Sequence, residues 1–210
     1  MKNYKDVTVP FADKMMCFPT DPQCSIQPHW TIKKGDAVNL SVFCFGSHTG
    51  THIDAPFHFS DTGKTVDQLD MHHFLGTAKV FEFLNQPCID MQDVSGLPVQ
   101  KGDIVLFKTK NSRYMREGTF REDFAYITGE AAEYFAGIKI STLGFDFLSI
   151  EQFSSKTFPA HHAIIGGGIV IIEGLDLTDV RPGEYDMVSL PMLVKGGNGS
   201  PIRVLLFDKE

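Results

Sequence analysis

The segment His48-Thr-Gly-Thr-His52-Ile-Asp54-Ala-Pro-Phe-His58 places three imidazoles and one carboxylate within eleven residues. A glycine and a proline interrupt it, so a continuous helix is disfavoured and we expect an extended or looped chain. In an extended chain, residues two apart point to the same side, so His48, His52, Asp54 and His58 would share one face. Imidazole nitrogens and a carboxylate are donors that Zn²⁺ or Mn²⁺ prefers, so the segment predicts a metal site.

Short β-rich segments lie on both sides of this motif. Residues 38–45 alternate between apolar and polar side chains and predict a strand that leads directly into the histidines. Residues 185–194 and 201–208 flank a glycine-rich loop, which predicts a hairpin. Other short apolar runs bounded by glycine or proline predict buried strands, at residues 78–84, 103–109, 138–143 and 169–172.

The clearest helix is predicted at residues 128–136, with Thr128 as its N-cap and Gly137 at its end. Many strands with few helices favour an α/β fold, which we expect to be a single domain over residues 1–210 with a mixed, barrel-like β-sheet and flanking helices. A chain of 210 residues with 42% hydrophobic content is long enough to bury the core of such a domain.

Composition and charge exclude several classes of protein. The net charge is -7 and the chain has no lysine or arginine cluster, so we expect no nucleic-acid partner. The N-terminus lacks the apolar run of a signal peptide and no later stretch could span a bilayer, so we expect no membrane partner and a cytoplasmic location. The four cysteines are irregularly spaced without a Cys-x-x-Cys pair, which indicates reduced thiols.

A second region of interest ends in a buried strand that is closed by a carboxylate. His161 and His162 lie in a short helical turn, a triple glycine follows, and the apolar run 169–172 ends in Glu173. An unpaired buried carboxylate is costly, so Glu173 needs either solvent or a partner such as a metal. These residues alone leave both alternatives open and favour a solvated strand end.

The motif at 48–58 resembles the His-x-Gly-Thr-His-x-Asp-x-Pro-x-His signature of the cyclase family, which includes bacterial-type kynurenine formamidase and isatin hydrolase. The resemblance extends over nearly the whole chain. Phe18-Pro-Thr-Asp21 is similar to the family's aromatic-Pro-Gly-Asp entry, and Gly144-Phe-Asp146-Phe-Leu-Ser149 to its Gly-x-Asp-x-x-Ser segment. The fold that this resemblance implies is the swivelling β/β/α arrangement of the cyclases.

The resemblance also implies roles for individual residues. The metal ligands would be His48, His52, Asp54, His161 and Glu173, with Asp54 bridging two Zn²⁺ or Mn²⁺ ions. His161 is preferred to His162 because its interval to Glu173 resembles that of the family. His58 matches the residue that has the acid/base role. Phe18 stands where kynurenine formamidase has a tryptophan against the substrate ring, and it would contact the substrate.

The expected activity is hydrolysis of a small amide-type C–N bond by metal-activated water, as in an arylformamidase. Opening of a cyclic amide, as in isatin hydrolase, is the first alternative, because the two activities differ only in pocket shape and a fold or motif does not decide between them. Metal binding without catalysis is the second alternative, and it would predict loss of the proton-shuttling group, whereas His58 is present. Serine chemistry has little support, since the chain contains no Gly-x-Ser-x-Gly sequence. The expected partners are a small-molecule substrate and further copies of the chain in a homodimer or homotetramer.

Overall fold

The computed structural model describes residues 3–209, and its centre is a mixed sheet of eight strands. β4 pairs with both β10 and β12, so seven of the strands close into a ring, while β1 pairs with the far end of β12. In sheet order the strands are β1 (Tyr4–Asp6), β12 (Gly199–Asp208), β11 (Gly183–Pro191), β5 (Leu75–Phe83), β7 (Ile104–Thr109), β9 (Thr142–Phe145), β10 (Val170–Glu173) and β4 (His52–Asp54). Four of them, β5, β7, β9 and β10, run parallel to one another.

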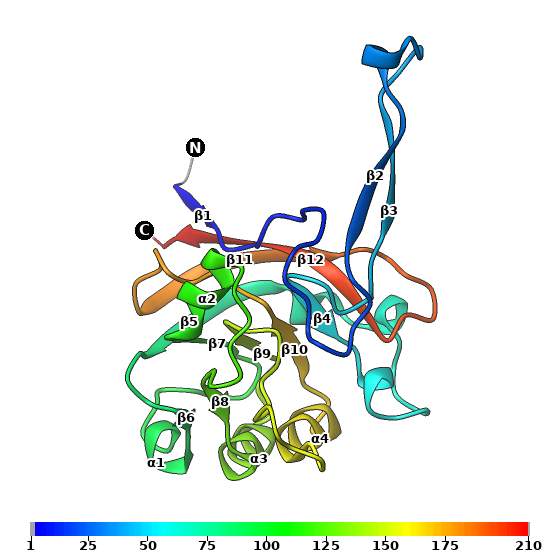
Figure 1. The fold of residues 1–210 in the computed structure, drawn as a ribbon. Helices are drawn as coiled ribbons and strands as arrows, with labels where there is room; N and C mark the ends of the chain where they lie inside the picture. Colours follow the sequence, from blue (N-terminus) through cyan, green and yellow to red (C-terminus); the bar gives the residue numbers. More distant parts are fainter. Residues whose placement is uncertain (1–2, 210) are drawn as a thin grey trace.

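The helices α1 (Met91–Val94), α3 (Gly129–Ile138) and α4 (Pro159–Gly166) lie in a row along one side of the sheet (Figure 1). A small parallel pair, β6 (Cys88–Ile89) and β8 (Tyr126–Ile127), lies near them, and α2 (Asn111–Glu117) follows β7. Short 3-10 helices occupy Ile32–Lys34, Pro56–His58, Val66–Gln68 and Met71–His73. None of the helices in the described chain has the length and apolar character needed to cross a bilayer.

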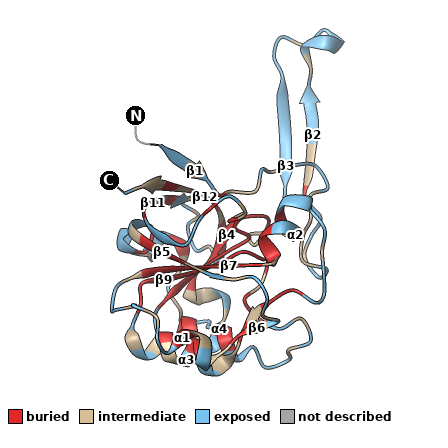
Figure 2. Cartoon of the chain, turned by 90° about the vertical axis from the view of Figure 1, so that its left-hand side faces the viewer, coloured by how far each residue is buried: buried red, intermediate tan, exposed pale blue. Residues whose placement is uncertain are grey.

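Two hydrophobic cores lie on the two faces of the ring, and the strands supply both by alternation. In β7, Ile104 and Leu106 belong to the core inside the ring, whereas Val105 and Phe107 pack toward the helices. A strand that is buried on both faces has a continuous run of apolar residues, and this run predicted β7 from the sequence. Figure 2 shows the buried strands at the centre of the molecule, between elements that are exposed on their outer sides.

β2 (Ser25–Trp30) and β3 (Leu40–Cys44) form a separate antiparallel ribbon, which we call the arm and define as residues 25–44. The arm projects from the body of the protein and is exposed over most of its length (Figures 1 and 2). All five residues of β3 are exposed. The predicted strand at 38–45 is therefore confirmed, but it lies outside the ring.

The structure confirms the predicted fold class, most of the predicted strands and the helix that begins at Thr128, whose hydroxyl accepts a hydrogen bond from Ala131 N. β11 and β12 form the predicted hairpin. The strand predicted at 138–143 begins only at Thr142, because α3 continues through Gly137 to Ile138 and ends at Lys139 in the left-handed conformation. An extended or looped chain was expected over 48–58. Only residues 52–54 form a strand, and turns and a short 3-10 helix make up most of the rest, so the single extended face is wrong.

Asp146, from the Gly-x-Asp-x-x-Ser segment, is a buried structural anchor. Its carboxylate accepts hydrogen bonds from the backbone N–H and hydroxyl of Thr109 and from those of Ser112, over 2.6–2.9 Å. Burial raises the pKa of Asp146 to about 6, while these four donors act in the opposite direction. Asp146 thus joins the ends of β7 and β9 to the start of α2.

We expect Asp146→Ala to lower the free energy of unfolding by about 3–5 kcal/mol, because it leaves four buried donors without their acceptor. Chemical denaturation of the variant and the wild type measures the difference. Asp123→Ala, at an exposed aspartate before β8, is the control and should change stability by less than about 0.5 kcal/mol. A loss below about 1 kcal/mol for Asp146→Ala would show that the anchor is dispensable.

Candidate metal centre

Separate elements bring the predicted site residues together at one edge of the ring. His48 lies in a turn before β4, His52 and Asp54 lie in β4, and His58 ends a 3-10 helix that begins at a proline. The histidines therefore do not share one face of an extended chain, because the chain changes direction between them. Gly50, with φ +67°, reverses the chain between the first two histidines.

Asp54 is the buried centre of the cluster. His48 Nδ1 lies 2.7 Å from Asp54 Oδ1 and, because a carboxylate only accepts, this nitrogen carries the proton. His52 Nδ1 donates in the same way to the Gly50 carbonyl over 2.9 Å. These bonds leave the Nε2 lone pair of each imidazole available to a cation.

Glu173 and His161 reach Asp54 from β10 and α4. His52 Nε2 lies 3.2 Å from Glu173 Oε2, and His161 Nε2 lies 3.4 Å from Glu173 Oε1 and 3.8 Å from Asp54 Oδ2. β10 pairs with β4 so that Glu173 lies opposite His52, which explains why residues distant in sequence meet here. Glu173 is buried, so it is not the solvated strand end that its sequence context favoured.

His161 is the better candidate of the adjacent histidine pair. It is buried, its ring stacks on Phe59 at 4.6 Å between centroids, and its Nε2 faces the two carboxylates. His162 is exposed, and its ring meets the edge of Phe59. The helical period of α4 turns the second side chain away from the cluster.

Glu151, which the sequence did not single out, holds His161 in place. Its Oε2 lies 3.1 Å from His161 Nδ1 and 3.3 Å from the His161 backbone nitrogen, and both are buried. A carboxylate on one ring nitrogen fixes the tautomer and leaves the other nitrogen free to bind a metal. The available sequence signal was an acidic residue before the predicted helical turn, which is common without such a role.

We expect Glu151→Gln to weaken metal binding by about 10–100-fold while the protein stays folded, because the amide fixes the His161 tautomer less strongly than the carboxylate. Competition with a chromogenic chelator measures the affinity, and circular dichroism reports the fold. Glu133→Gln on the exposed side of α3 is the matched control. Equal affinities for Glu151→Gln and the wild type would make Glu151 a structural partner of α4 only.

The electrostatics of the cluster favour added positive charge. Burial acts to lower the pKa of His161, but Glu151 and Glu173 outweigh it and raise the pKa to about 10. His52 has a raised pKa for the same reason, against burial, because Glu173 and Asp54 lie beside it. Burial lowers the pKa of His58, although the charge of Asp54 acts in the opposite direction. The buried carboxylates thus draw protons onto imidazoles, a positive charge that a cation could supply instead.

The donor atoms fit a transition metal. Two ligands about 2.1 Å from a tetrahedral ion are roughly 3.4 Å apart, and the separations of 3.2–3.8 Å from His52 and His161 to the two carboxylates bracket this value. Within residues 3–209, three buried atoms lack a hydrogen-bond partner although they face the cluster: His48 Nε2, His52 Nε2 and Asp54 Oδ2. Such orphaned atoms are costly unless something binds them.

The donors fall into two groups that share Asp54. One comprises His48, Asp54 and His58, and the other His52, Asp54 and Glu173, with ligand atoms within 4.8 Å of one another in each group. The first group shows that His58 lies close enough to bind a cation, and its ring lies 3.9 Å from that of His48. His58 therefore lies beside the donor cluster as well as at the cavity that opens onto it.

A cavity of about 320 Å³ opens onto the cluster. Phe18 forms part of its wall and is held by edge-to-face contact with Phe120, at 5.6 Å between ring centroids, and by Phe153. The wall also includes Phe59 and Phe158, while Asp21, Ser149 and the histidines supply polar groups. The apolar wall and the polar floor suit a small molecule with an aromatic part.

Comparison with known proteins agrees with this geometry. A model of the family described as Cyclase matches residues 5–152. The chain is 32% identical over 206 residues to the kynurenine formamidase of Geobacillus thermodenitrificans, an alignment that covers 98% of each chain. The chain belongs to the cyclase family. The predicted resemblance is therefore confirmed.

Solved structures with the same fold extend this comparison. A structure described as a potential metal-dependent hydrolase with cyclase activity is 36% identical, covers 100% of both chains and has a TM-score of 0.88. Isatin hydrolase A from Labrenzia aggregata is 21% identical, with 99% of this chain and 94% of that chain covered and a TM-score of 0.82. The second likeness shows the common cyclase fold.

Proposed function

We propose that this cyclase-family protein is a metal-dependent hydrolase that cleaves a small amide-type C–N bond, most closely that of an aryl formamide. The observation that carries the proposal is the position of Asp54, a buried carboxylate that both donor groups share, while the other members of these groups line an aromatic cavity. The sequence similarity to kynurenine formamidase supports the bond type. The structural similarity to a metal-dependent hydrolase supports the need for a metal.

Zn²⁺ or Mn²⁺ would be held by His48, His52, Asp54, His161 and Glu173, and Asp54 would serve both ions if two are bound, because it belongs to both donor groups. Bound ions of this kind polarise a carbonyl group and lower the pKa of water from 15.7 toward about 7. Glu173 is fixed for this role because its Oε1 also accepts the backbone N–H of Ile150 over 2.7 Å. Nδ1 of His48, His52 and His161 each has a partner, so their rings are oriented before any ligand arrives.

His58 is proposed to move the proton from the attacking water to the leaving nitrogen. It lies at the wall of the cavity beside the cluster, where an imidazole can reach a substrate bound against Phe18. Phe18, Phe59 and Phe158 would exclude water from the aromatic part of the substrate. No acyl-enzyme is needed, since water is the nucleophile.

A substrate panel tests the proposal. The purified protein is analysed for bound metals and assayed with N-formylkynurenine, formanilide, isatin and a cyclic imide, before and after treatment with a chelator. We expect hydrolysis of an aryl formamide, its loss with the metal and its return on addition of Zn²⁺ or Mn²⁺. Faster turnover of isatin would select the lactam alternative, and metal without turnover of any compound would select a binding protein.

Two further expectations extend the proposal. We infer a homo-oligomer, a homodimer or homotetramer, because the exposed arm leaves apolar side chains uncovered in a single chain. The cytoplasmic location stays a prediction.

A further inference from the structure

A glycine-rich turn lies against the candidate metal centre, although it supplies none of the donors. We call residues 195–199, in the connection between β11 and β12, the clamp turn. β12 begins at Gly199, which lies opposite Asp54 in the sheet. The clamp turn therefore meets the group of His48, Asp54 and His58, which we call the outer donor group.

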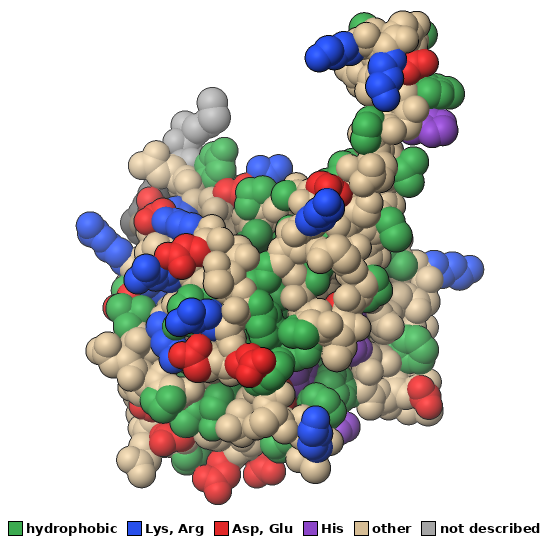
Figure 3. All heavy atoms as spheres, viewed as in Figure 1, with side chains coloured by type: hydrophobic (Ala, Val, Ile, Leu, Met, Phe, Trp, Pro, Cys, Tyr) green, Lys and Arg blue, Asp and Glu red, His purple; other side chains and the backbone are tan. Residues whose placement is uncertain are grey.

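The two donor groups differ in how deeply they are buried. Every residue of the group His52, Asp54 and Glu173 is buried, and we call it the inner donor group. Asp54 is the single buried residue of the outer donor group, and the side chain of His48 is 16% exposed. Histidine side chains reach the surface between hydrophobic ones on the face shown in Figure 3. The outer donor group therefore needs more support from its neighbours to keep its position.

Gly199 provides the space that the ring of His48 occupies. A Cβ atom at this position would lie 2.5 Å from Cε1 of His48, 2.8 Å from its Nε2 and 2.8 Å from the carbonyl oxygen of Ile53. Cβ atoms in proteins do not have neighbours closer than 3.0 Å, so any other residue would displace the ring or the strand. Gly199 does not have a positive φ, so the glycine is required for space and not for its conformational freedom.

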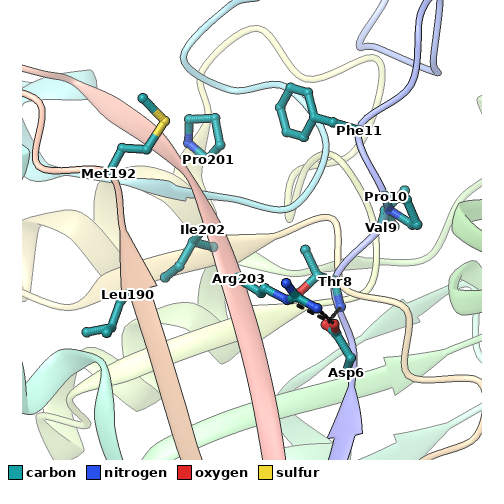
Figure 4. A pocket seen from close by; sticks show the side chains of 10 residues that line it. All are labelled: Asp6, Thr8, Val9, Pro10, Phe11, Leu190, Met192, Pro201, Ile202 and Arg203. Atoms are coloured by element: carbon teal, nitrogen blue, oxygen red, sulfur yellow. Dashed lines mark hydrogen bonds and ion pairs between the residues drawn. The ribbon is translucent and has the colours of Figure 1, made fainter. Parts of the chain in front are cut away.

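The strand is held on both sides, so it has little freedom to move away from the ring. The first residues of β12 pair with β4, and the following ones pair with β11. Figure 4 shows Ile202 and Arg203 on β12 beside Leu190 on the neighbouring strand. A side chain at position 199 would therefore displace the ring of His48 more readily than β12.

Asn198 ties the clamp turn to both ends of the donor motif. Its carbonyl oxygen accepts the N–H of Ala55 over 3.0 Å, directly after the buried aspartate. Its side-chain oxygen accepts the hydroxyl of Ser47 over 2.8 Å, directly before His48. The clamp turn thus fixes the backbone on either side of the motif, while the glycine that follows accommodates the ring.

The position of this ring decides whether His48 can bind a cation. Its Nδ1 donates to Asp54 over 2.7 Å, and its buried Nε2 has no hydrogen-bond partner among residues 3–209. Restoring a separation of 3.0 Å from 2.5 Å would move the ring by about 0.5 Å. A metal site has to be held within roughly this distance of its productive geometry, about 0.5 Å. A single added methyl group at Gly199 is therefore enough to disturb the outer donor group.

We propose that Gly199 and Asn198 are positioning residues, which hold the ring of His48 against Asp54 and so complete the outer donor group. The inference rests on the proposed metal site. Glu173 of the inner donor group comes from β10, and its Oε1 accepts the backbone N–H of Ile150. The inner donor group therefore depends much less on the clamp turn.

Calorimetric titration of the metal-free protein with Zn²⁺ tests the effect on metal binding. Gly199→Ala should weaken binding at the outer donor group by about 10–100-fold, because it displaces a ligand, and leave the inner group close to wild type. Asn198→Ala should weaken the same group to a smaller extent. Gly137→Ala in α3 is the matched control, since its Cβ would meet no atom outside its own helix within 4 Å.

A double-mutant cycle separates positioning of His48 from general damage to the strand. In a His48→Ala background the ring is gone and the contact with Ile53 remains, so Gly199→Ala should cost less metal affinity there than in the wild type. Equal losses in the two backgrounds would overturn the inference.

Nuclear magnetic resonance gives a readout that needs no metal. Long-range ¹H–¹⁵N spectra of the metal-free wild type should show His48 with a protonated Nδ1 and a bare Nε2, and Gly199→Ala should alter these signals. Unchanged His48 signals in the folded variant would contradict the proposal. If Gly199→Ala does not fold, the same criterion applies to Asn198→Ala, whose altered side chain is exposed. A wild type that takes up no ion would refute the proposed metal site but not the positioning of His48.

Discussion

Asp54→Asn should abolish metal-dependent hydrolysis, with a loss in turnover of roughly 10⁴-fold or more. Both donor groups contain Asp54, so one substitution removes a ligand from each and also the acceptor that orients His48. An asparagine has nearly the same size but offers only a neutral carbonyl oxygen. Metal analysis and steady-state kinetics on the same preparation measure the two effects.

Asp61→Asn is the matched control for this prediction, because Asp61 is an exposed aspartate in the loop after His58. It should leave metal content and rate unchanged. If Asp54→Asn kept its metals and most of its activity, neither of the donor groups would be the catalytic centre. The hydrolase proposal would then have to be abandoned for this cavity.

His58→Ala should retain its metals and its fold but lose about 10²–10⁴ in kcat, because a general acid or base typically contributes that factor. The structure makes this variant decisive, since His58 belongs to a donor group and also lines the cavity. His162→Ala, at the exposed neighbour on α4, is the control and should be close to wild type. Loss of metal from His58→Ala would make His58 a ligand, and full activity would exclude it from proton transfer.

The strands of the ring were predictable from the sequence, because a strand that is buried on both faces has apolar residues at successive positions. Residues 104–107 of β7 and 170–172 of β10 are apolar at successive positions, and Gly102 and Gly168 lie just before these runs. The helix at Gly129–Ile138 was predictable from its cap. The closure of the ring was not, since the strand His52–Asp54 has only three residues and its two partners lie far along the chain.

In the candidate site, too, the sequence predicted local features but not those that depend on contacts between distant residues. The composition of the 48–58 motif identified its donors, but the inferred extended face was wrong because Gly50 turns the chain and the proline at 56 begins a 3-10 helix. The partner of Glu173 is His52, which lies far away in the sequence, so the residues around Glu173 could not predict this contact. Glu151 escaped notice because its role depends wholly on the packing of the residues before α4.

The way in which the ring closes bears on how the protein is made. Asp54 lies opposite both Ile171 and Gly199, so β4 joins the ring through contacts between distant parts of the chain. Contacts of this kind form slowly, because the entropy of closing long loops has to be overcome first. His52 and Asp54 meet Glu173 only through this pairing, so the donor group of these three residues is complete only once the ring has closed. The closed ring is thus a precondition for this donor group, whereas the group of His48, Asp54 and His58 lies within eleven residues of the sequence.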